Sequence, residues 1–99
     1  MRPVGHVLPE LLRELGLERE VQGWRAVQEW PRVVGTRIAR RTRAIAFHQG
    51  TLHVEVEGSA WLQELGYLRR DLLQRLHAAL GAAPVRDLRF TIARRGTRR

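Results

Sequence analysis

The sequence contains no cysteine and no lysine. Without cysteine the chain can form neither a disulfide framework nor a thiolate metal site, which suits a cytoplasmic protein. Apolar runs are short, and none approaches the roughly 20 residues that a transmembrane helix needs. The first residues also lack the apolar core and the small-residue cleavage site of a secretory signal. We therefore expect a cytoplasmic protein that makes no contact with a membrane.

Positive charge dominates the composition. All 18 basic residues are arginines, they outnumber the 10 acidic residues, and the formal net charge is +8. A GC-rich or thermophilic coding bias explains the choice of arginine over lysine, but it does not explain the excess of arginine over acid. Such an excess on a small domain favours a polyanionic partner, with nucleic acid first and an acidic protein surface second.

Length and composition predict a single folded domain. A chain of 99 residues is long enough for one hydrophobic core, because it buries roughly two-thirds of its unfolded surface. Charged residues make up 28% and hydrophobic residues 43% of the chain, which is typical of a globular protein rather than a disordered one. We expect residues 1–93 to form this domain and residues 94–99 to form a basic, flexible tail.

The first half of the chain predicts helices. Apolar residues recur at helical spacing over residues 7–15, which predicts a helix over about Leu8–Leu15. A second pattern over 24–41 predicts two helical halves joined at Trp30-Pro31, because proline disfavours helix at the residue before it. Gly35 inside the second half costs about 1 kcal/mol relative to alanine. We therefore expect a large side chain, such as an indole, to pack against Gly35.

A β-hairpin is the clearest local signal in the middle of the chain. Apolar and polar residues alternate over 52–57, and a preceding strand over 43–48 leads into the turn pair Gln49-Gly50. The two-residue turn predicts the pairs His48 with Thr51, Phe47 with Leu52, Ala46 with His53 and Ile45 with Val54. This register places every large apolar side chain on one face: Ile45, Phe47, Leu52, Val54 and Val56. Because glutamine is an unusual partner of glycine in such turns, a loop one residue longer is the alternative.

The chain after the hairpin predicts a long helix and a final strand. Gly58 breaks the second strand, and Ser59 is expected to cap a helix over about Ala60–Leu80. Its predicted buried stripe consists of Trp61, Leu65, Leu68, Leu72, Leu76 and Leu80. Gly66 is a point at which the helix could divide, and Gly81 is a natural stop. Alternating apolar residues then predict a last strand over Val85–Ala93.

The predicted order of elements is α-α-β-β-α-β. It indicates an α+β fold with a small three-stranded sheet and helices packed on one face. The last strand can join the hairpin parallel to one of its strands through a right-handed crossover. This order is compatible with KH-like nucleic-acid-binding domains. The G-x-x-G loop with which KH domains clamp single strands is absent from the sequence, so that clamp is not predicted.

Several motifs, taken in order, resemble the DciA family of bacterial proteins. The resemblance covers about Leu8 to Ile92, and the combination of motifs is more specific than any one of them. The motifs are Trp30-Pro31-Arg32-Val33-Val34-Gly35, Ile38-Ala39, Gly50-Thr51-Leu52-His53-Val54-Glu55-Val56 and Ser59-Ala60-Trp61-Leu62-Gln63-Glu64-Leu65.

The resemblance implies a KH-like domain that binds DNA and that helps to load or operate the replicative DNA helicase at replication initiation. Many relatives carry a long basic extension beside this domain, whereas only Arg94–Arg99 stand in that place here. The expected partners are therefore DNA, single-stranded or duplex, and the replicative helicase, with the chain as a monomer or weak oligomer. A protein-interaction module and an RNA-binding protein are the alternatives.

Arginines provide the candidate nucleic-acid site. Arg37 and Arg41 lie one turn apart in the predicted helix, so they can line one ridge with Arg40 beside them. Guanidinium groups bind phosphate through a bidentate fork, and the alternative is a solvated helix face. The full predicted set adds one strand residue and the tail: Arg37, Arg40, Arg41, Arg43, Arg89, Arg94, Arg95, Arg98 and Arg99.

Aromatic residues are predicted to be mainly structural. Each tryptophan has Val or Leu neighbours on an apolar stripe, which favours core packing over base stacking. This expectation applies to Trp24, Trp30 and Trp61. Tyr67 lies near the edge of its stripe and is a better interface candidate, together with Arg69 and Arg70. Glu55 and Glu57 argue against nucleic acid lying across the hairpin.

No catalytic site is predicted. His48 and His53 can share the outer face of the sheet near the turn, but a metal site there would need more ligands and only Glu55 is near. No Ser-His-Asp order, paired carboxylates or glycine-rich phosphate loop stands out. We therefore predict that the protein is not an enzyme and that it uses no cofactor and no metal.

Overall fold

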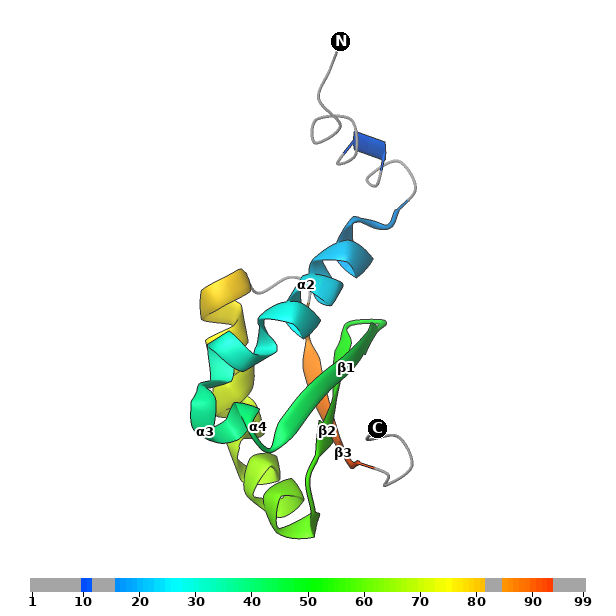
Figure 1. Cartoon of the computed structure of the whole chain (residues 1–99). Coiled ribbons are helices and arrows are strands. Elements are labelled where there is room, and N and C mark those ends of the chain that lie inside the picture. The colour runs from blue at the N-terminus through cyan, green and yellow to red at the C-terminus, as the bar shows by residue number, and fades with distance from the viewer. Residues whose placement is uncertain (1–9, 12–15, 82–84, 94–99) are drawn as a thin grey trace.

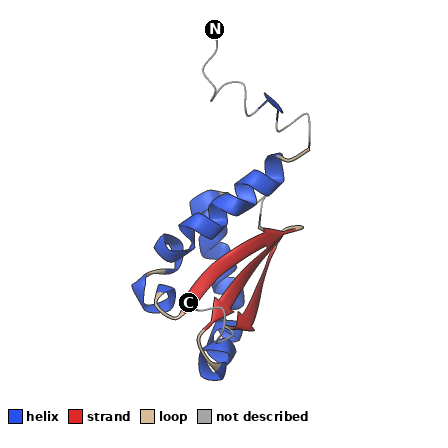
Figure 2. Cartoon of the chain, turned by 45° about the vertical axis from the view of Figure 1, so that its right-hand side comes forward, coloured by secondary structure: helices blue, strands red, loops and turns tan. Residues whose placement is uncertain are grey.

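A three-stranded sheet with helices on one side forms the domain. The computed structural model describes residues 10–11, 16–81 and 85–93 (Figure 1). The elements are α2 (Glu18–Val34), α3 (Thr36–Ala39), β1 (Thr42–His48), β2 (Thr51–Val56), α4 (Ser59–Leu80) and β3 (Asp87–Ile92). Helices α2 and α4 lie on the same side of the sheet (Figure 2). The predicted α+β fold and its order of elements are confirmed. The predicted helix over Leu8–Leu15 lies largely outside the described residues, and the tail 94–99 lies wholly outside them.

Strand β2 is the centre of the sheet. The strand order is β1-β2-β3, with β1 antiparallel and β3 parallel to β2. The predicted parallel return of the last strand is therefore correct. All three apolar side chains of β2 are fully buried, namely Leu52, Val54 and Val56. They meet the helices through a core that also contains Trp30, Val34, Ile38, Phe47, Leu65, Leu72, Leu76, Val85 and Leu88.

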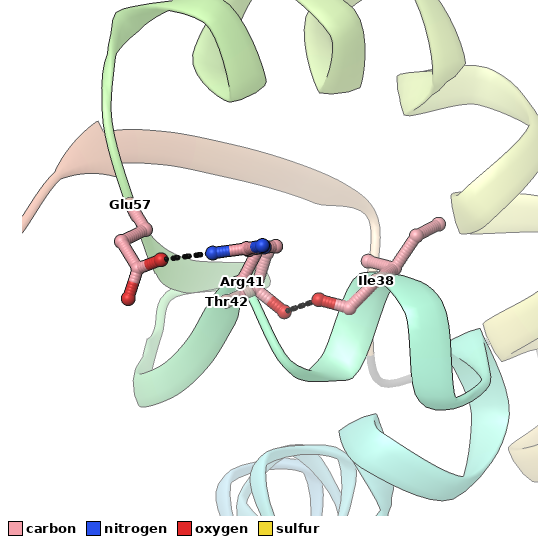
Figure 3. Close-up of polar contacts among 4 residues, drawn as sticks. All are labelled: Ile38, Arg41, Thr42 and Glu57. Carbon is pink, nitrogen blue, oxygen red and sulfur yellow. Dashed lines mark hydrogen bonds and ion pairs between the residues drawn. The ribbon is translucent and has the colours of Figure 1, made fainter.

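One buried indole links two helices to the sheet. Trp30 of α2 is fully buried, and its Nε1 donates a hydrogen bond of 2.8 Å to Oγ1 of Thr42 at the start of β1. The same hydroxyl donates to the carbonyl oxygen of Ile38 in α3, also at 2.8 Å (Figure 3). A hydroxyl offers one donor and two acceptor positions, so Thr42 can serve both neighbours at once. The predicted core position of Trp30 is confirmed.

The helix break lies at Gly35 and not at Pro31. Helix α2 continues through Pro31 to Val34, so the predicted division at Trp30-Pro31 is wrong. Proline removes one helical hydrogen bond, but burial of Trp30 and Val34 on either side holds the segment helical. Gly35 has φ of 90° and caps α2 through its N–H, which donates to the Pro31 carbonyl at 3.1 Å. Nothing lies within 4 Å of a Cβ built there, so the expected packing of an indole against Gly35 is also wrong.

A β-bulge changes the register of the hairpin. The pairs of His48, Phe47 and Ala46 follow the prediction, but Val54 pairs with Ala44 and not with Ile45. Ile45 is therefore 41% exposed, and the prediction that it faces the core is wrong. A bulge adds one residue to one strand only, so alternation of apolar residues cannot locate it.

The turn of the hairpin has two residues, as predicted. Gln49 and Gly50 both have positive φ, 49° and 83°. Two positive φ values in succession are the mark of a type I′ turn, whose twist matches the strands that it joins. The longer loop is therefore excluded.

Helix α4 is continuous, and its first residue is Ser59. The residue before the helix is Gly58, with φ of 94°, and no side chain caps it, so the predicted cap by Ser59 is wrong. Gly66 does not divide the helix, and Gly81 ends it as predicted. The prediction of a core position is also wrong for Trp24 of α2, which is 47% exposed. Helical spacing identifies a side of a helix, but burial depends on whether another element covers that side.

We predict that Gly23 and Gly66, both inside helices, respond in opposite ways to alanine. A Cβ at Gly23 would overlap the buried Phe47 ring, whereas one at Gly66 would meet nothing within 4 Å. Gly23→Ala should lower the free energy of unfolding by about 2 kcal/mol, because overpacking of about 3 kcal/mol exceeds a gain of about 1 kcal/mol in helix propensity. Gly66→Ala should raise it by about 1 kcal/mol. Urea denaturation measures both, and a shift of the same sign in the two variants would contradict the packing.

The hydroxyl of Thr42 provides a second test of the fold. Thr42→Val keeps the shape of the side chain but leaves the buried Trp30 Nε1 without an acceptor. We expect a loss of about 1–3 kcal/mol in the free energy of unfolding. Thr42→Ser retains the hydroxyl and is the matched control, so it should cost clearly less in the same denaturation experiment. Equal losses would show that the hydrogen bond is not what stabilises this junction.

Candidate nucleic-acid interface

The junction between α3 and β1 carries the basic segment singled out in the sequence. Helix α3 ends at Ala39, so Arg37 and Arg41 do not line one helical ridge. The Arg37 guanidinium lies over the Trp61 ring at 5.3 Å from its centroid. Arg41 instead reaches the end of β2, where its Nη1 lies 2.8 Å from Oε1 of Glu57 (Figure 3). The segment therefore spreads its cations over the junction instead of aligning them.

Arg40 and Arg43 are the available cations of this junction. Both side chains are exposed, and neither has an ion-pair or hydrogen-bond partner among the residues that the structure describes. They border a hollow of about 200 Å³ that is also lined by Arg41, Thr42, Glu55, Val56, Glu57 and Ala93. A hollow with three guanidinium groups at its rim can accept a phosphate, although Glu57 already neutralises Arg41. The carboxylates of Glu55 and Glu57 lie on the β2 side of this hollow, and it is there that they would repel a phosphate.

The outer face of the sheet contributes Arg89 of β3. Its register partner is His53 of β2, and both project from the side opposite the helices. On the same face Arg43 of β1 stands opposite Glu55 of β2. Figure 2 shows no described helix on this face, and the side chains of Arg43 and Arg89 on it are exposed. The outer face is therefore mixed in charge, with arginine on both edge strands and glutamate between them.

The predicted interface residues of α4 are all exposed. Tyr67 is 77% exposed, and its hydroxyl accepts a hydrogen bond of 3.1 Å from Nε2 of Gln63. Nη1 of Arg69 lies 3.3 Å from Oδ1 of Asp87 in β3, whereas Arg70 has no such partner in the described part of the chain. Of the three α4 residues, only Arg69 contacts β3. They are a separate surface from the α3–β1 junction.

Arg86 was not expected to have a role, yet it holds the hairpin turn. Its N–H donates to the Gly50 carbonyl at 2.7 Å, and its Nη2 donates to the Gln49 carbonyl at 3.3 Å. The two partners are 37 residues apart in sequence, so no local pattern could have revealed this contact. The side chain of Arg86 is thereby engaged in structure, which removes it from the cations available to a ligand.

The structure sorts the described arginines into engaged and available ones. Arg32, Arg41, Arg69 and Arg75 form ion pairs with carboxylates. Arg37 stacks on an indole and Arg86 holds the turn. The side chains without a partner among the described residues are Arg25, Arg40, Arg43, Arg70 and Arg89. The predicted contacts Arg94, Arg95, Arg98 and Arg99 lie outside the described residues.

Trp61 is a partly buried residue at the start of α4 and not a core residue. It packs against the core with one side, while Arg37 covers its ring. A small hollow beside it is lined by Arg37, Ala60, Trp61 and Glu64. The exposed guanidinium of Arg37 above this ring is a plane on which an unpaired base can stack. The prediction that Trp61 belongs to the core is therefore only half right.

The described residues offer no metal site. No three His, Cys, Asp or Glu side chains gather there in a way that could hold a metal ion. His48 and His53 do lie on the outer face of the sheet, as predicted from the register. None of the described helices is long and apolar enough to cross a membrane.

Comparisons with known proteins agree with the motifs. The model of the family described as "Dna[CI] antecedent, DciA" matches residues 3–90. The UPF0232 protein of Mycobacterium tuberculosis (strain ATCC 25618 / H37Rv) is 33% identical over 90 residues, which are 91% of this chain and 48% of that protein. The UPF0232 proteins of Mycobacterium marinum (strain ATCC BAA-535 / M) and Mycobacterium leprae (strain TN) are 31% and 30% identical with the same coverage. The chain thus spans about half the length of the curated relatives it matches.

The family match extends over all the described elements up to Phe90 of β3. It includes the buried Trp30, the turn at Gly50 and the start of α4, which are the parts on which the motif resemblance depended. Sequence similarity and motif order point to one conclusion. The chain belongs to the DciA family.

Proposed function

We propose that this protein is a nucleic-acid-binding accessory protein that assists the replicative DNA helicase and is not itself an enzyme. The observation that carries the nucleic-acid part is the set of arginines left without a partner in the described structure, above all Arg40, Arg43 and Arg89. Carboxylates neutralise Arg32, Arg41, Arg69 and Arg75 locally, whereas these three have no carboxylate partner among the described residues. An anionic backbone is the ligand that such a surface attracts most strongly.

The arrangement of these arginines favours contact with a phosphate backbone without a fixed base sequence. Arg40 and Arg43 border the hollow at the α3–β1 junction, and Arg89 lies on the other edge strand of the same sheet. Guanidinium groups on both edges can follow a backbone along the uncovered face, while Glu55 limits its approach to the centre. The stack of Arg37 on Trp61 adds a place for an unpaired base.

The helicase part of the proposal rests on family membership. The DciA resemblance implies a role in loading or operating the helicase, and the family match covers most of this chain. A protein-interaction module that uses the same arginines on an acidic partner is the second candidate. An RNA-binding protein is the third, because phosphate contacts alone do not distinguish the two nucleic acids.

Salt dependence tests the nucleic-acid interface. If about six arginines contact phosphates, the slope of log affinity against log salt on duplex DNA should be near −5. Replacing Arg40, Arg43 and Arg89 together by alanine should reduce the magnitude of that slope by about 2.7, since each lost phosphate contact removes about 0.9. Fluorescence anisotropy with labelled DNA from low to moderate salt measures both slopes.

The matched control is the double variant Arg32→Ala and Arg75→Ala. These arginines are also exposed, but each pairs with a carboxylate on its own helix. The control should leave the salt slope within about half a unit of the original, because no phosphate contact is lost. No binding at low salt, or an unchanged slope in the triple variant, would refute the assigned surface. Competition by single-stranded DNA, duplex DNA and RNA separates the DNA and RNA candidates.

A nuclease-treated pull-down tests the helicase role. The purified cognate helicase should be captured by this chain after all nucleic acid has been digested, if the two proteins contact each other directly. The triple arginine variant should still capture it if the helicase contact is separate from the phosphate contacts. Capture that disappears with nuclease would show that DNA bridges the two proteins, and the direct helicase role would then fail.

A further inference from the structure

The two edges of the sheet differ in whether another strand can be added. Strands β1 and β3 are the edge strands. The register of β1 is interrupted between Ala44 and Ala46, whereas β3 pairs with β2 without a break from Asp87 to Ile92. A bulge protects an edge from further pairing, but a regular edge is a template for it. No described residue pairs with the outer edge of β3.

Hydrogen bonds on the inner side of β3 show which backbone groups face outward. Asp87 donates its N–H to the carbonyl oxygen of Gly50, just before β2, at 3.2 Å, and Ala93 donates to that of Val56, the last residue of β2, at 2.9 Å. Alternate residues of a parallel pair point their peptide groups in opposite directions, so Leu88, Phe90 and Ile92 point theirs away from β2. The Leu88 N–H already meets the Asp87 carboxylate at 2.8 Å. The peptide groups of Phe90 and Ile92 remain to pair with a further strand.

A groove of about 430 Å³ runs beside this edge, between β3 and α4. Leu62, Gly66 and Arg69 line it from the helix, spaced so that they share one helical face. The groove is open at Gly66, where a Cβ would meet nothing within 4 Å. Gly66 does not have a positive φ, so its backbone conformation does not require glycine. Glycine also weakens a helix, so helix stability does not explain it either. The absence of a side chain at Gly66 leaves space between α4 and β3.

Charge indicates what kind of strand would bind there. Among the described residues, Asp87 is the one acidic residue that lines the groove, and Arg69 already neutralises it at 3.3 Å. Arg89 lines the groove and has no partner among the described residues, so the net charge of the groove is positive. A second copy of this chain would bring the same arginines against one another, which like-charge repulsion disfavours. An acidic strand complements them.

We propose that the β3 edge and the groove at Gly66 bind an extended acidic segment of a partner protein by β-strand addition. Backbone hydrogen bonds to Phe90 and Ile92 hold the segment, its apolar side chains fill the space over Gly66, and its acidic side chains, on the opposite face, meet Arg89. This inference goes beyond the proposed phosphate contacts, since it concerns a protein ligand bound through backbone groups of β3, and Arg89 is the one residue common to both. It holds whether or not the chain binds nucleic acid.

The probe is a synthetic heptapeptide of alternating glutamate and valine, added to the isotopically labelled full chain. Amide hydrogen exchange measured by NMR should slow at least tenfold at Phe90 and Ile92 when the peptide binds. The amides of Arg89 and Thr91 should not change, because they already bond to β2. Slowed exchange at every second amide of β3 indicates strand pairing, because attraction between charges alone would not produce that pattern.

Two variants of α4 separate groove binding from general effects. Gly66→Leu fills the groove without removing any contact, so it should keep the fold and weaken peptide binding at least tenfold. Ala78→Leu adds the same side chain to an exposed position of the same helix, about 18 Å farther along it, and should leave binding unchanged. Thermal unfolding of both variants checks that each is folded. If both variants bind the peptide equally weakly, or if Gly66→Leu binds it as well as the original chain, the peptide does not bind in the groove.

Other occupants of the edge give different and recognisable results. If a lysine–valine heptapeptide binds as tightly as the glutamate–valine one, the inference that the partner segment is acidic is overturned. Protection of Phe90 and Ile92 that grows with protein concentration in the absence of peptide would place a second copy there and overturn it as well. Protection of the same amides by a thymidine oligonucleotide, but not by the peptide, would assign the groove to nucleic acid. The salt-slope experiment on Arg40, Arg43 and Arg89 is read separately, so failure of one proposal does not carry over to the other.

Discussion

The hydrogen-bonded chain from Trp30 through Thr42 to Ile38 is the interaction on which the rest of the fold depends. It joins α2, β1 and α3 at one point, with both distances at 2.8 Å. Burying an indole is favourable only if its single N–H finds an acceptor, and the Thr42 hydroxyl supplies it where β1 begins. This contact sets where α3 must end and β1 must start. It thereby places Arg40, Arg41 and Arg43 around the junction instead of along a helix.

The architecture leaves distinct surfaces for distinct ligands. Helices cover one face of the sheet, so the opposite face and both edges are where a long ligand can approach (Figure 2). The β1 edge carries a bulge and the basic junction, a combination that discourages strand pairing and favours phosphate. The β3 edge is regular and lies beside a groove. The proposed phosphate contacts and the proposed strand addition therefore use largely different parts of the sheet, with Arg89 common to both.

Local patterns predicted most of the fold. Alternation identified β2 and β3, helical spacing identified α4, and the turn pair Gln49-Gly50 was correct because both residues adopt the positive φ of its turn type. Errors arose where a tertiary contact overrode a local rule. Helix α2 continues through Pro31 because burial outweighs one lost hydrogen bond, and Ile45 faces outward because a bulge shifts the strand.

The candidate site was less predictable than the fold. Sequence identified the arginine-rich segment, but it could not tell that Arg41 meets Glu57 or that Arg37 covers Trp61, since these partners are far apart in the chain. Arg86 shows the same limit, because its role in the turn appears only when β3 is laid beside β2.

The sequence by itself determined the positive charge, the alternation of β2 and the motifs of the DciA family, because charge, period and motif are properties of neighbouring residues. Only the tertiary structure decided which arginines remain available. Whether a cation is neutralised depends on which carboxylate folding brings within reach, and that partner comes from another element of the fold.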